Sequence, residues 1–469
     1  MIEEEKTYKD LKEEDNDALD ELLGLTEEDV IIIQKALESN DFVMVQTHVG
    51  KLHPADMADL YEQLSSNMRE NLLDALGDEL NGEIISHLDD TLRDDVLETM
   101  RPKPLAKLLK DLESDDAIGL LEDLDVDKQK FVLSYVSRAD RALYEEVLSY
   151  ADETAARIMR RELVSIPEIW TVEHVINMLR QDSKDLPDKF QSVVVLGRGH
   201  KPLGILALSV LLRSARQSSV KSLLQEDEFY AIPADMPQED VAYLFQQYDL
   251  IEAPVVDEAG RLIGIITIDD IVDIIEEEAG DDILKLGGVR EGDFHEDVLD
   301  TARLRFPWLG INLGTAILAS IVIASYADAL REIVALAILM PIVASMGGNA
   351  GTQTLTVAVR ALATNDLTST NALRIVWKES LVGGLNGLLF AIIIGGAVWF
   401  WFDDAILGMT IAVAMVLNLL VAGIAGILVP LTLEKFDFDP AISSTVFLTT
   451  ITDILGFFVF LGLATVVLL

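Results

Sequence analysis

Five long apolar stretches near the end of the chain constrain its fold more than any other feature. Residues 306–327, 333–359, 380–402, 405–433 and 440–469 follow one another, and the only charged side chain among them is Asp453. Each stretch is long enough to cross a bilayer as a helix. One such stretch could be a buried helix of a soluble protein, but five in succession cannot all be hidden in a soluble core. The sequence therefore predicts a membrane domain with five spans.

Charge is distributed very unevenly along the 469 residues. Residues 301–469 hold only 10 of the 80 acidic and 7 of the 36 basic residues, so nearly all of the net charge of −44 lies before them. An acidic soluble region argues against nucleic-acid binding, which needs positive charge. The absence of cysteine excludes disulfides, thiolate zinc sites and cysteine nucleophiles. The first residues are acidic and have no apolar core, so we expect no secretory signal.

Basic residues at the ends of the spans predict their orientation, because cytoplasmic loops are enriched in Lys and Arg. One side of the predicted membrane has only Arg331, beside several acidic residues. The other side has Arg303, Arg305, Arg360, Arg374, Lys378 and Lys435. We therefore expect the large N-terminal region to be cytoplasmic and the C-terminus to lie outside.

The segment 51–150 repeats with a period of 24 residues. Apolar positions recur in four series, Leu60–Ile84–Leu108–Val132, Leu64–Leu88–Leu112–Val136, Leu72–Val96–Leu120–Tyr144 and Leu76–Met100–Leu124–Leu148. The spacing within each repeat indicates two short amphipathic helices that must stack on their neighbours to bury their apolar faces. A helical superhelix is the predicted fold, acting as a scaffold or as a binding surface.

Residues 162–278 contain two similar halves, each with short apolar strands followed by a helix. These halves resemble a tandem CBS module. The second copy carries Gly264, Thr267 and Asp270 in the family's Gly-x-x-Thr-x-x-Asp ribose-contact pattern, whereas the first copy has Gly204, Ala207 and Val210 at those positions. The resemblance leaves two interpretations open: an adenine nucleotide such as ATP binds at one site at most, or the pair is a dimerisation and switching element without nucleotide.

The helix that leaves this module is strongly acidic. Asp270, Asp273, Glu277 and Asp281 share one helical face, where like charges repel. Such a run is usually a solvated surface. Because this helix leads directly into the membrane, we favour a sensor that a divalent cation compacts.

Two polar segments interrupt the apolar spans. The first, 341–353, joins Pro341 and paired glycines to Asn349, Thr352 and Gln353. The proline and glycines predict a loosened helix with free carbonyls, and the alternative is a close helix crossing through small residues. The second segment carries Asp453, and a carboxylate at the centre of a span costs on the order of 3 kcal/mol and usually lines a substrate path. Carboxylate, amide and hydroxyl oxygens suit a hard, mostly hydrated cation such as Mg²⁺.

With these features together, the chain resembles the MgtE family of bacterial magnesium channels over nearly its whole length. The most specific residues are the Gly-Gly-Asn-x-Gly-Thr-Gln core that ends at Gln353, and Asp439-Pro440-Ala441 followed by Thr449-Thr450-x-x-Asp453. The resemblance implies a multidomain membrane protein with a superhelical N-domain, a tandem α/β CBS pair, a connecting plug helix and a five-helix transmembrane domain. The boundaries are a tail at 1–27, then 28–150, 151–278, 279–305 and 306–469.

The resemblance also implies a function and its residues. A homodimer would pass Mg²⁺ into the cell through the bacterial inner membrane. The pore ion would lie among Asp453, Asn349, Gly348, Thr352, Gln353 and Thr449, with Asp439 at the cytoplasmic mouth. The connector that contains Arg303 would close the pore when cytosolic Mg²⁺ binds Asp270, Asp273, Glu278, Asp281 and Asp282.

Other functions remain alternatives at this stage. A broader divalent channel or exchanger would carry Co²⁺ or Mn²⁺ as well, and a membrane receptor for Mg²⁺ or nucleotide would signal without transport. An enzyme is disfavoured because no nucleophile–base pair or phosphate-binding loop is recognisable. An anion channel is disfavoured because Asp453 would repel its substrate.

Overall fold

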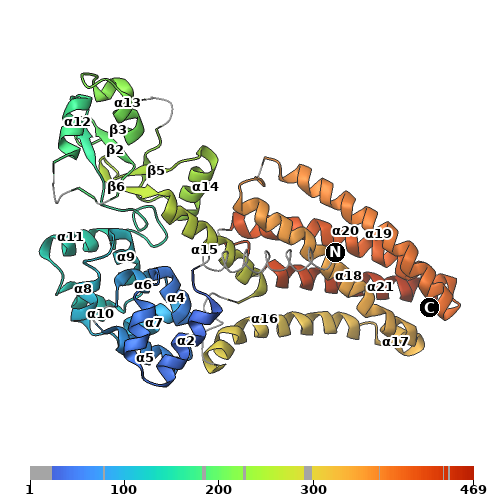
Figure 1. The fold of residues 1–469 in the computed structure, drawn as a ribbon. Coiled ribbons are helices and arrows are strands. Elements are labelled where there is room, and N and C mark those ends of the chain that lie inside the picture. Colours follow the sequence, from blue (N-terminus) through green and yellow to red (C-terminus); the bar gives the residue numbers. More distant parts are fainter. Residues whose placement is uncertain are drawn as a thin grey trace, which may run out of the picture. The chain divides into compact units, whose positions relative to one another are not determined.

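The computed structural model describes residues 24–77, 80–181, 186–187, 189–224, 229–289, 298–368, 370–436, 438–441 and 444–469. Most of the predicted tail, 1–27, lies outside these residues. The chain divides into a first unit, Met1–Glu276, and a second unit, Glu277–Leu469. The first unit joins short helices to two small sheets, and the second consists mainly of long helices (Figure 1).

Short helices in series build the first part of the first unit. They are α2 Glu27–Glu38, α3 Phe42–Val49, α4 Pro54–Glu62, α5 Ser66–Leu76, α6 Gly82–Ser86, α7 Asp90–Thr99, α8 Pro102–Leu108, α9 Ser114–Glu122, α10 Val126–Leu133 and α11 Arg138–Val147. The helices α5, α7, α9 and α11 begin 24 residues apart, which is the period read from the sequence. Proline in the first turn of α4 and α8 favours helix initiation. A backbone N–H at that position would have no partner within the helix, so its absence in proline costs nothing.

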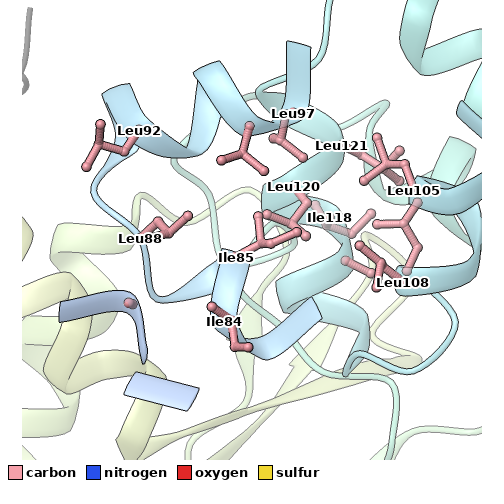
Figure 2. Close-up of a cluster of buried hydrophobic side chains, with 14 of the residues drawn as sticks. Ile84, Ile85, Leu88, Leu92, Leu97, Leu105, Leu108, Ile118, Leu120 and Leu121 are labelled. Atoms are coloured by element: carbon pink, nitrogen blue, oxygen red, sulfur yellow. The ribbon is translucent and has the colours of Figure 1, made fainter. Parts of the chain in front are cut away.

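The recurring apolar positions form the core of this helical series. Leu60, Leu72 and Val132 are fully buried, and Ile84 and Leu108 are each 9% exposed. Figure 2 shows how side chains from α6, α7, α8 and α9 meet in one apolar cluster. Each short helix thus contributes one face to a shared core, as expected for repeats that cannot fold alone.

Two similar three-stranded sheets follow. The first contains β1 Ser165–Pro167, β2 Ser192–Leu196 and β3 Pro202–Ala207, and the second contains β4 Ile232–Pro233, β5 Glu252–Val256 and β6 Leu262–Thr267. In each sheet the first strand pairs parallel and the third antiparallel to the central strand. The accompanying helices are α12 Val172–Leu179, α13 Leu208–Arg213, the 3₁₀ turn η2 Val220–Leu223, and α14 Gln238–Tyr248. The two sheets share one topology, which matches the two halves predicted from the sequence.

The helix α15, Ile268–Gly287, follows directly after β6 and reaches into the second unit. The remaining helices are α16 Val298–Ala324, α17 Ala327–Glu332, α18 Val334–Ala363, α19 Ala372–Phe402, α20 Ala405–Lys435 and α21 Ser444–Leu468. Among the described residues, five of these helices are long and apolar enough to cross a membrane, and α17 is a short addition between two of them. Arg303, predicted to lie in the connector, is part of the long helix α16.

Glycines allow α19 and α20 to pack with their backbones in contact. A Cβ on Gly383 would lie 2.6 Å from the Leu419 carbonyl oxygen, and one on Gly408 would lie 2.6 Å from the Gly395 carbonyl oxygen. Such approach through small residues is a common means of helix association in membranes. The turn between the helices uses Asp403 in the left-handed region (φ 52°) and Asp404, whose carboxylate caps the first turn of α20.

The second span is not broken at the proline and glycines that were predicted to loosen it. The helix α18 continues from Val334 to Ala363 through Pro341 and the paired glycines. Gly347 and Gly351 instead allow close packing, because an added Cβ would lie 2.2 Å from Asn418 Nδ2 and 3.0 Å from Leu448, respectively. The glycines therefore follow the alternative considered above, a close crossing of helices.

Candidate functional site

The residues predicted to bind the pore ion lie along the packed helices α18 and α21. Gly348 lies opposite Thr449, whose Cγ2 atom would be 4.0 Å from an added Cβ. Gly347 and Gly456 both approach Asn418 of α20. Because Asp453 lies between Thr449 and Gly456 in α21, it is level with this glycine pair of α18.

Not all of the predicted ligands lie at that level. Thr352 is one turn further along α18 than Gly348 and shares its face of the helix. Gln353 points elsewhere, because it lines a cavity between α18, α19 and α20. Asn349 is exposed on the surface of the single chain. The structure thus brings Gly348, Thr449 and Asp453 to one level and separates Gln353 from them.

Asp453 is partly buried, nine residues from the start of α21. Within the described parts of the chain, no residue forms an ion pair or hydrogen bond with its carboxylate. The hydroxyls of Thr449 and Thr452 donate to backbone carbonyls one turn earlier, so their oxygen lone pairs remain available as acceptors. A membrane helix therefore carries a carboxylate whose counter-charge is not supplied by these residues of the same chain.

A row of polar side chains runs along the exposed surface of α18. Its members, Ser345, Asn349, Gln353 and Thr356, recur at helical spacing. All four are exposed in the single chain. Amides facing hydrocarbon are costly, so this polar row requires water or another protein surface against it.

Asn418 is a buried polar residue that the sequence interpretation missed. It is 2% exposed, and its Nδ2 donates to the Val343 carbonyl at 2.8 Å. Its Oδ1 is buried without a partner in the described part of the chain. The side chain occupies the space left by Gly347 and Gly456, so it joins α20 to both α18 and α21, and Gly456 is three residues beyond Asp453.

The end of α15 contacts the residue predicted for the cytoplasmic mouth. Lys285 Nζ lies 2.8 Å from Asp439 Oδ2 and 2.5 Å from Asp281 Oδ2. Asp439 Oδ1 also accepts a hydrogen bond from the Ala441 amide at 2.7 Å, which fixes the turn before α21. Burial disfavours the charged amine, but the two carboxylates outweigh it and raise the pKa of Lys285 above its ordinary value.

Apolar and backbone contacts reinforce this junction within the second unit. Leu286 packs against a cluster that includes Leu355 of α18 and Leu448 of α21. The Thr445 hydroxyl donates to the Leu286 carbonyl at 3.2 Å. Burial, and then the nearby Asp439 carboxylate, raise the pKa of Asp282. The acidic end of α15 is therefore held against α18 and α21 by Lys285 and by the contacts of Leu286.

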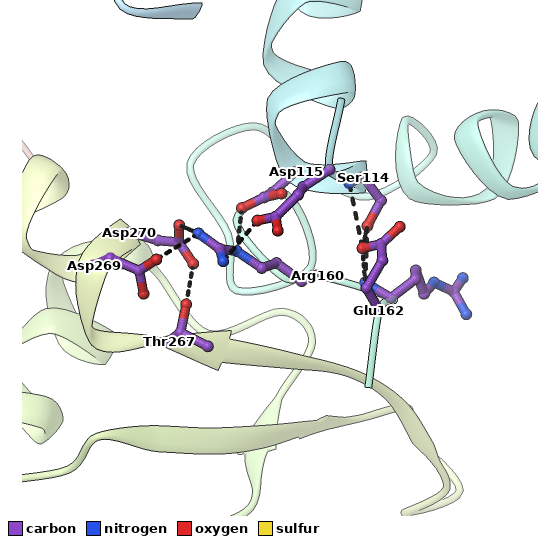
Figure 3. A network of polar contacts seen from close by, with 9 residues as sticks. Ser114, Asp115, Arg160, Glu162, Thr267, Asp269 and Asp270 are labelled. Carbon is purple, nitrogen blue, oxygen red and sulfur yellow. Dashed lines mark hydrogen bonds and ion pairs between the residues drawn. The ribbon is translucent and has the colours of Figure 1, made fainter. Parts of the chain in front are cut away.

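Asp270 lies in a different environment, a network around Arg160 in the first unit (Figure 3). The guanidinium contacts Asp270, Asp115 at 2.9 Å, Glu113 at 2.6 Å and Asp269 at 2.8 Å. The Thr267 hydroxyl donates to the second Asp270 oxygen at 2.7 Å. Four carboxylates thus converge on a single positive charge, and Asp115 Oδ1 is buried with no partner in the described residues.

Burial is the main influence on the pKa values of several acids around Arg160 and along α15, and it raises them. Burial and the neighbouring Asp115 raise the pKa of Asp270, although Arg160 opposes the shift. Burial likewise raises the pKa of Asp116 to about 6. Burial also raises the pKa of Asp273, against the attraction of His87. In the described residues no three Asp, Glu or His side chains are arranged to hold one metal ion, so the predicted regulatory acids do not form a complete ligand set within this chain.

Of the predicted nucleotide residues Gly264, Thr267 and Asp270, Thr267 lines a cavity of about 360 Å³ in the first unit, whereas the other two do not. Thr267 lines it, together with Arg160 and Lys189 and with the acids Glu83, Asp111, Glu113, Glu162 and Glu252. Gly264 is required for packing, because an added Cβ would lie 2.5 Å from Met159 Sδ. The cavity has room for a nucleotide-sized ligand, but it presents more carboxylates than cations.

Comparison with known proteins agrees with this architecture. Three family profiles match: the MgtE intracellular N domain at residues 52–153, CBS domains at 155–216 and 220–277, and MgtE, a divalent cation transporter, at 340–463. The magnesium transporter MgtE of Thermus thermophilus is 31% identical over 444 residues, which cover 93% of this chain and 98% of that protein. The chain belongs to the MgtE family.

Other MgtE proteins are similar over comparable lengths. Magnesium transporter MgtE of Bacillus subtilis is 28% identical over 437 residues, covering 93% of this chain and 96% of that protein. Among solved structures, the cytosolic domain of the Mg²⁺ channel MgtE in complex with ATP is 28% identical, covers 52% of this chain and 99% of that chain, and has a TM-score of 0.48. The soluble part of a magnesium transporter, also 28% identical, has a TM-score of 0.46 and covers 54% of this chain and 99% of that chain.

Proposed function

We propose that this chain is a magnesium channel that admits Mg²⁺ to the bacterial cytosol down its electrochemical gradient. The observation that carries the proposal is Asp453, a carboxylate within a membrane helix that the described residues leave without a counter-charge. Thr449 and Thr452 lie within one helical turn of it in α21, and Gly348 of α18 lies opposite Thr449, so few direct protein ligands are available, which suits a cation that keeps most of its water. Membership of a divalent cation transporter family supports the same activity.

The pore is proposed to form between two copies of the chain. The polar row on α18 would cost free energy against lipid, and a second copy with water between the two would cover it. In a symmetric dimer the two Asp453 carboxylates would face the same axial ion. Asn349, Gly348, Thr352 and Thr449 complete the proposed wall, whereas Gln353, which the sequence predicted for it, lines the neighbouring cavity.

Cytosolic Mg²⁺ is proposed to close the channel through α15. Asp281, Asp282 and Glu278 lie on the part of α15 that ends at the Lys285–Asp439 contact. Asp273 is exposed on the same helix, whereas Asp270 is already paired with Arg160. We therefore assign the main regulatory role to the acids of the distal half of α15, which would bind Mg²⁺ together with groups of another copy.

The proposed domains keep the boundaries expected above: 28–150 as helical-repeat domain, 151–278 as CBS pair, 279–305 as connector and 306–469 as membrane domain. The N-terminal region would be cytoplasmic, the C-terminus outside, and the protein multi-pass in the inner membrane. ATP is a second proposed ligand, in the cavity beside Thr267. The carboxylates there mean that its phosphates would need Mg²⁺ as a counter-ion.

Ion flux into proteoliposomes of the purified full-length protein tests the proposal. We expect Mg²⁺ uptake that falls as Mg²⁺ is raised on the side of the soluble region. Equal uptake of Co²⁺ or Mn²⁺ in competition would favour a broader divalent channel. No flux of any of these ions, with intact binding of Mg²⁺ or ATP, would overturn the channel and favour a receptor.

A further inference from the structure

The helix α19 carries a carboxylate that the proposed pore does not use. Glu379 lies near the start of α19, one residue before the span predicted from the sequence. Its side chain is only 13% exposed, whereas those of Trp377 and Lys378 are largely exposed. The helix therefore turns Glu379 towards the protein interior and its two neighbours outwards.

Glu379 opens into a cavity of about 180 Å³ between α18, α19 and α20. Three other polar side chains line this cavity: Gln353 and Thr354 from α18, and Asn386 from α19. The Thr354 hydroxyl lies 3.4 Å from Glu379 Oε2. The other lining residues are small or apolar: Ala350, Val357, Val382, Gly383, Leu419 and Gly423.

The charge of Glu379 is only weakly compensated. Lys378 Nζ approaches Oε1 at 3.4 Å, but its side chain is 71% exposed, and such solvated pairs contribute little. Among the described residues that line the cavity, none is Lys or Arg. A carboxylate in a membrane helix usually marks an ion or proton path rather than a structural contact, and α19 is one of the candidate membrane helices.

The cavity is separate from the contact between α18 and α21 at which Asp453 lies. Gly348 of α18 faces Thr449 of α21, whereas Thr354 faces α19 and α20. A Cβ on Gly426 of α20 would lie 2.8 Å from Thr354 Cβ, so α18 and α20 are in contact at that point. The helix α18 thus has one oxygen-bearing surface on each side.

We propose that Glu379, Gln353, Thr354 and Asn386 form a second site for a hydrated divalent cation. One carboxylate, two amide oxygens and a hydroxyl are hard ligands of the kind that Mg²⁺ and Ca²⁺ accept. The volume holds several water molecules, as a cation with few direct protein ligands requires. The proposal stands on this cavity and does not require Asp453 to conduct ions.

Co²⁺ quenching of Trp377 tests the site in full-length protein in nanodiscs. Substituting Trp170, Trp308, Trp399 and Trp401 by Phe leaves Trp377, two residues from Glu379, as the reporter. We expect saturable quenching that Mg²⁺ reverses. Glu379→Gln should weaken the apparent affinity roughly tenfold or more, because it removes the carboxylate of the proposed ligand set.

Matched variants separate this site from others. Asn386→Leu should weaken quenching as well, which covers the case in which Glu379→Gln does not fold. Asp453→Asn should leave the quenching of Trp377 unchanged, and so should Glu332→Gln on the exposed surface of α17. Absence of saturable quenching, quenching insensitive to Glu379→Gln, or loss with Asp453→Asn would overturn the proposal. Failure of Mg²⁺ flux in the wild type would overturn the channel without affecting this result.

Discussion

Removal of the Arg160 guanidinium should open the network in the first unit. Arg160 is 20% exposed, and its partners Asp115 and Asp270 are 11% and 16% exposed, whereas Asp269 and Glu113 are at least half exposed. Breaking a buried pair from one side costs about 3–5 kcal/mol, and exposed pairs add little. Allowing for partial solvation, we expect Arg160→Ala to destabilise this contact by about 3 kcal/mol, because four carboxylates would then face one another uncompensated.

Amide hydrogen exchange measures this effect locally in the full-length protein. A loss of about 3 kcal/mol corresponds to roughly 100-fold faster exchange through local opening. We expect this over residues 113–118 and 265–271. Mg²⁺ should partly restore protection in the variant, by about 1.4 kcal/mol at ten times its dissociation constant, because a divalent cation can replace the guanidinium between the acids.

The wild type provides the decisive comparison. Since Arg160 supplies a permanent positive charge, protection of these segments in the wild type should not change when Mg²⁺ is chelated. Arg141→Ala is a matched control, because the ion pair that Arg141 forms with Glu145 in α11 is solvated and should matter little. Equal Mg²⁺ dependence in wild type and Arg160→Ala, or unchanged exchange in the variant, would refute the reasoning.

Three further predictions follow from single contacts. The raised pKa of Asp116, about 6, means that the folded state holds a proton that the unfolded state has lost. Stability of the first unit should therefore fall as pH rises from about 4 to above 6, and higher protection at pH 8 than at pH 5.5 in exchange experiments would contradict this. Gly347→Ala should destabilise the membrane domain by about 1–3 kcal/mol, because the added Cβ would clash with Asn418 of α20. Gly348→Ala should be tolerated, because the nearest described atom would lie 4.0 Å from its Cβ. Equal melting temperatures of the two variants in nanodiscs would disprove the difference. Lys285→Met should speed amide exchange over residues 281–288 in chelator, with recovery in Mg²⁺, and unchanged exchange would count against the anchor.

The sequence predicted the architecture well because periodicity and hydropathy are local signals. The helices that start at Ser66, Asp90, Ser114 and Arg138 follow the period of the apolar positions. Span ends were less accurate, since α19 begins at Ala372, eight residues before the predicted stretch. Because the predicted stretch began at residue 380, Glu379 was not recognised as a carboxylate within a membrane helix.

Contacts between distant residues could not be predicted. Arg160 meets Asp115 and Asp270, which are 45 and 110 residues away, and no periodic pattern links them. The continuity of α18 through Pro341 also depends on its neighbours. The side chain of Asn418 from α20, for example, fills the space beside Gly347. Chemistry at single positions, such as the carboxylate of Asp453 within an apolar helix, was visible from the residues alone.

The most direct test of the account is Mg²⁺ uptake by Asp453→Asn beside the wild type, in proteoliposomes with equal amounts of folded protein. Asp328→Asn serves as the control, because Asp328 lies on the exposed surface of α17 and is 95% exposed. We predict uptake at the background level for Asp453→Asn and unchanged uptake for Asp328→Asn, because Asp453, unlike Asp328, is proposed to supply a charge to the ion within the membrane. Uptake by Asp453→Asn within about twofold of the wild type, a barrier difference below about 0.5 kcal/mol, would contradict the account.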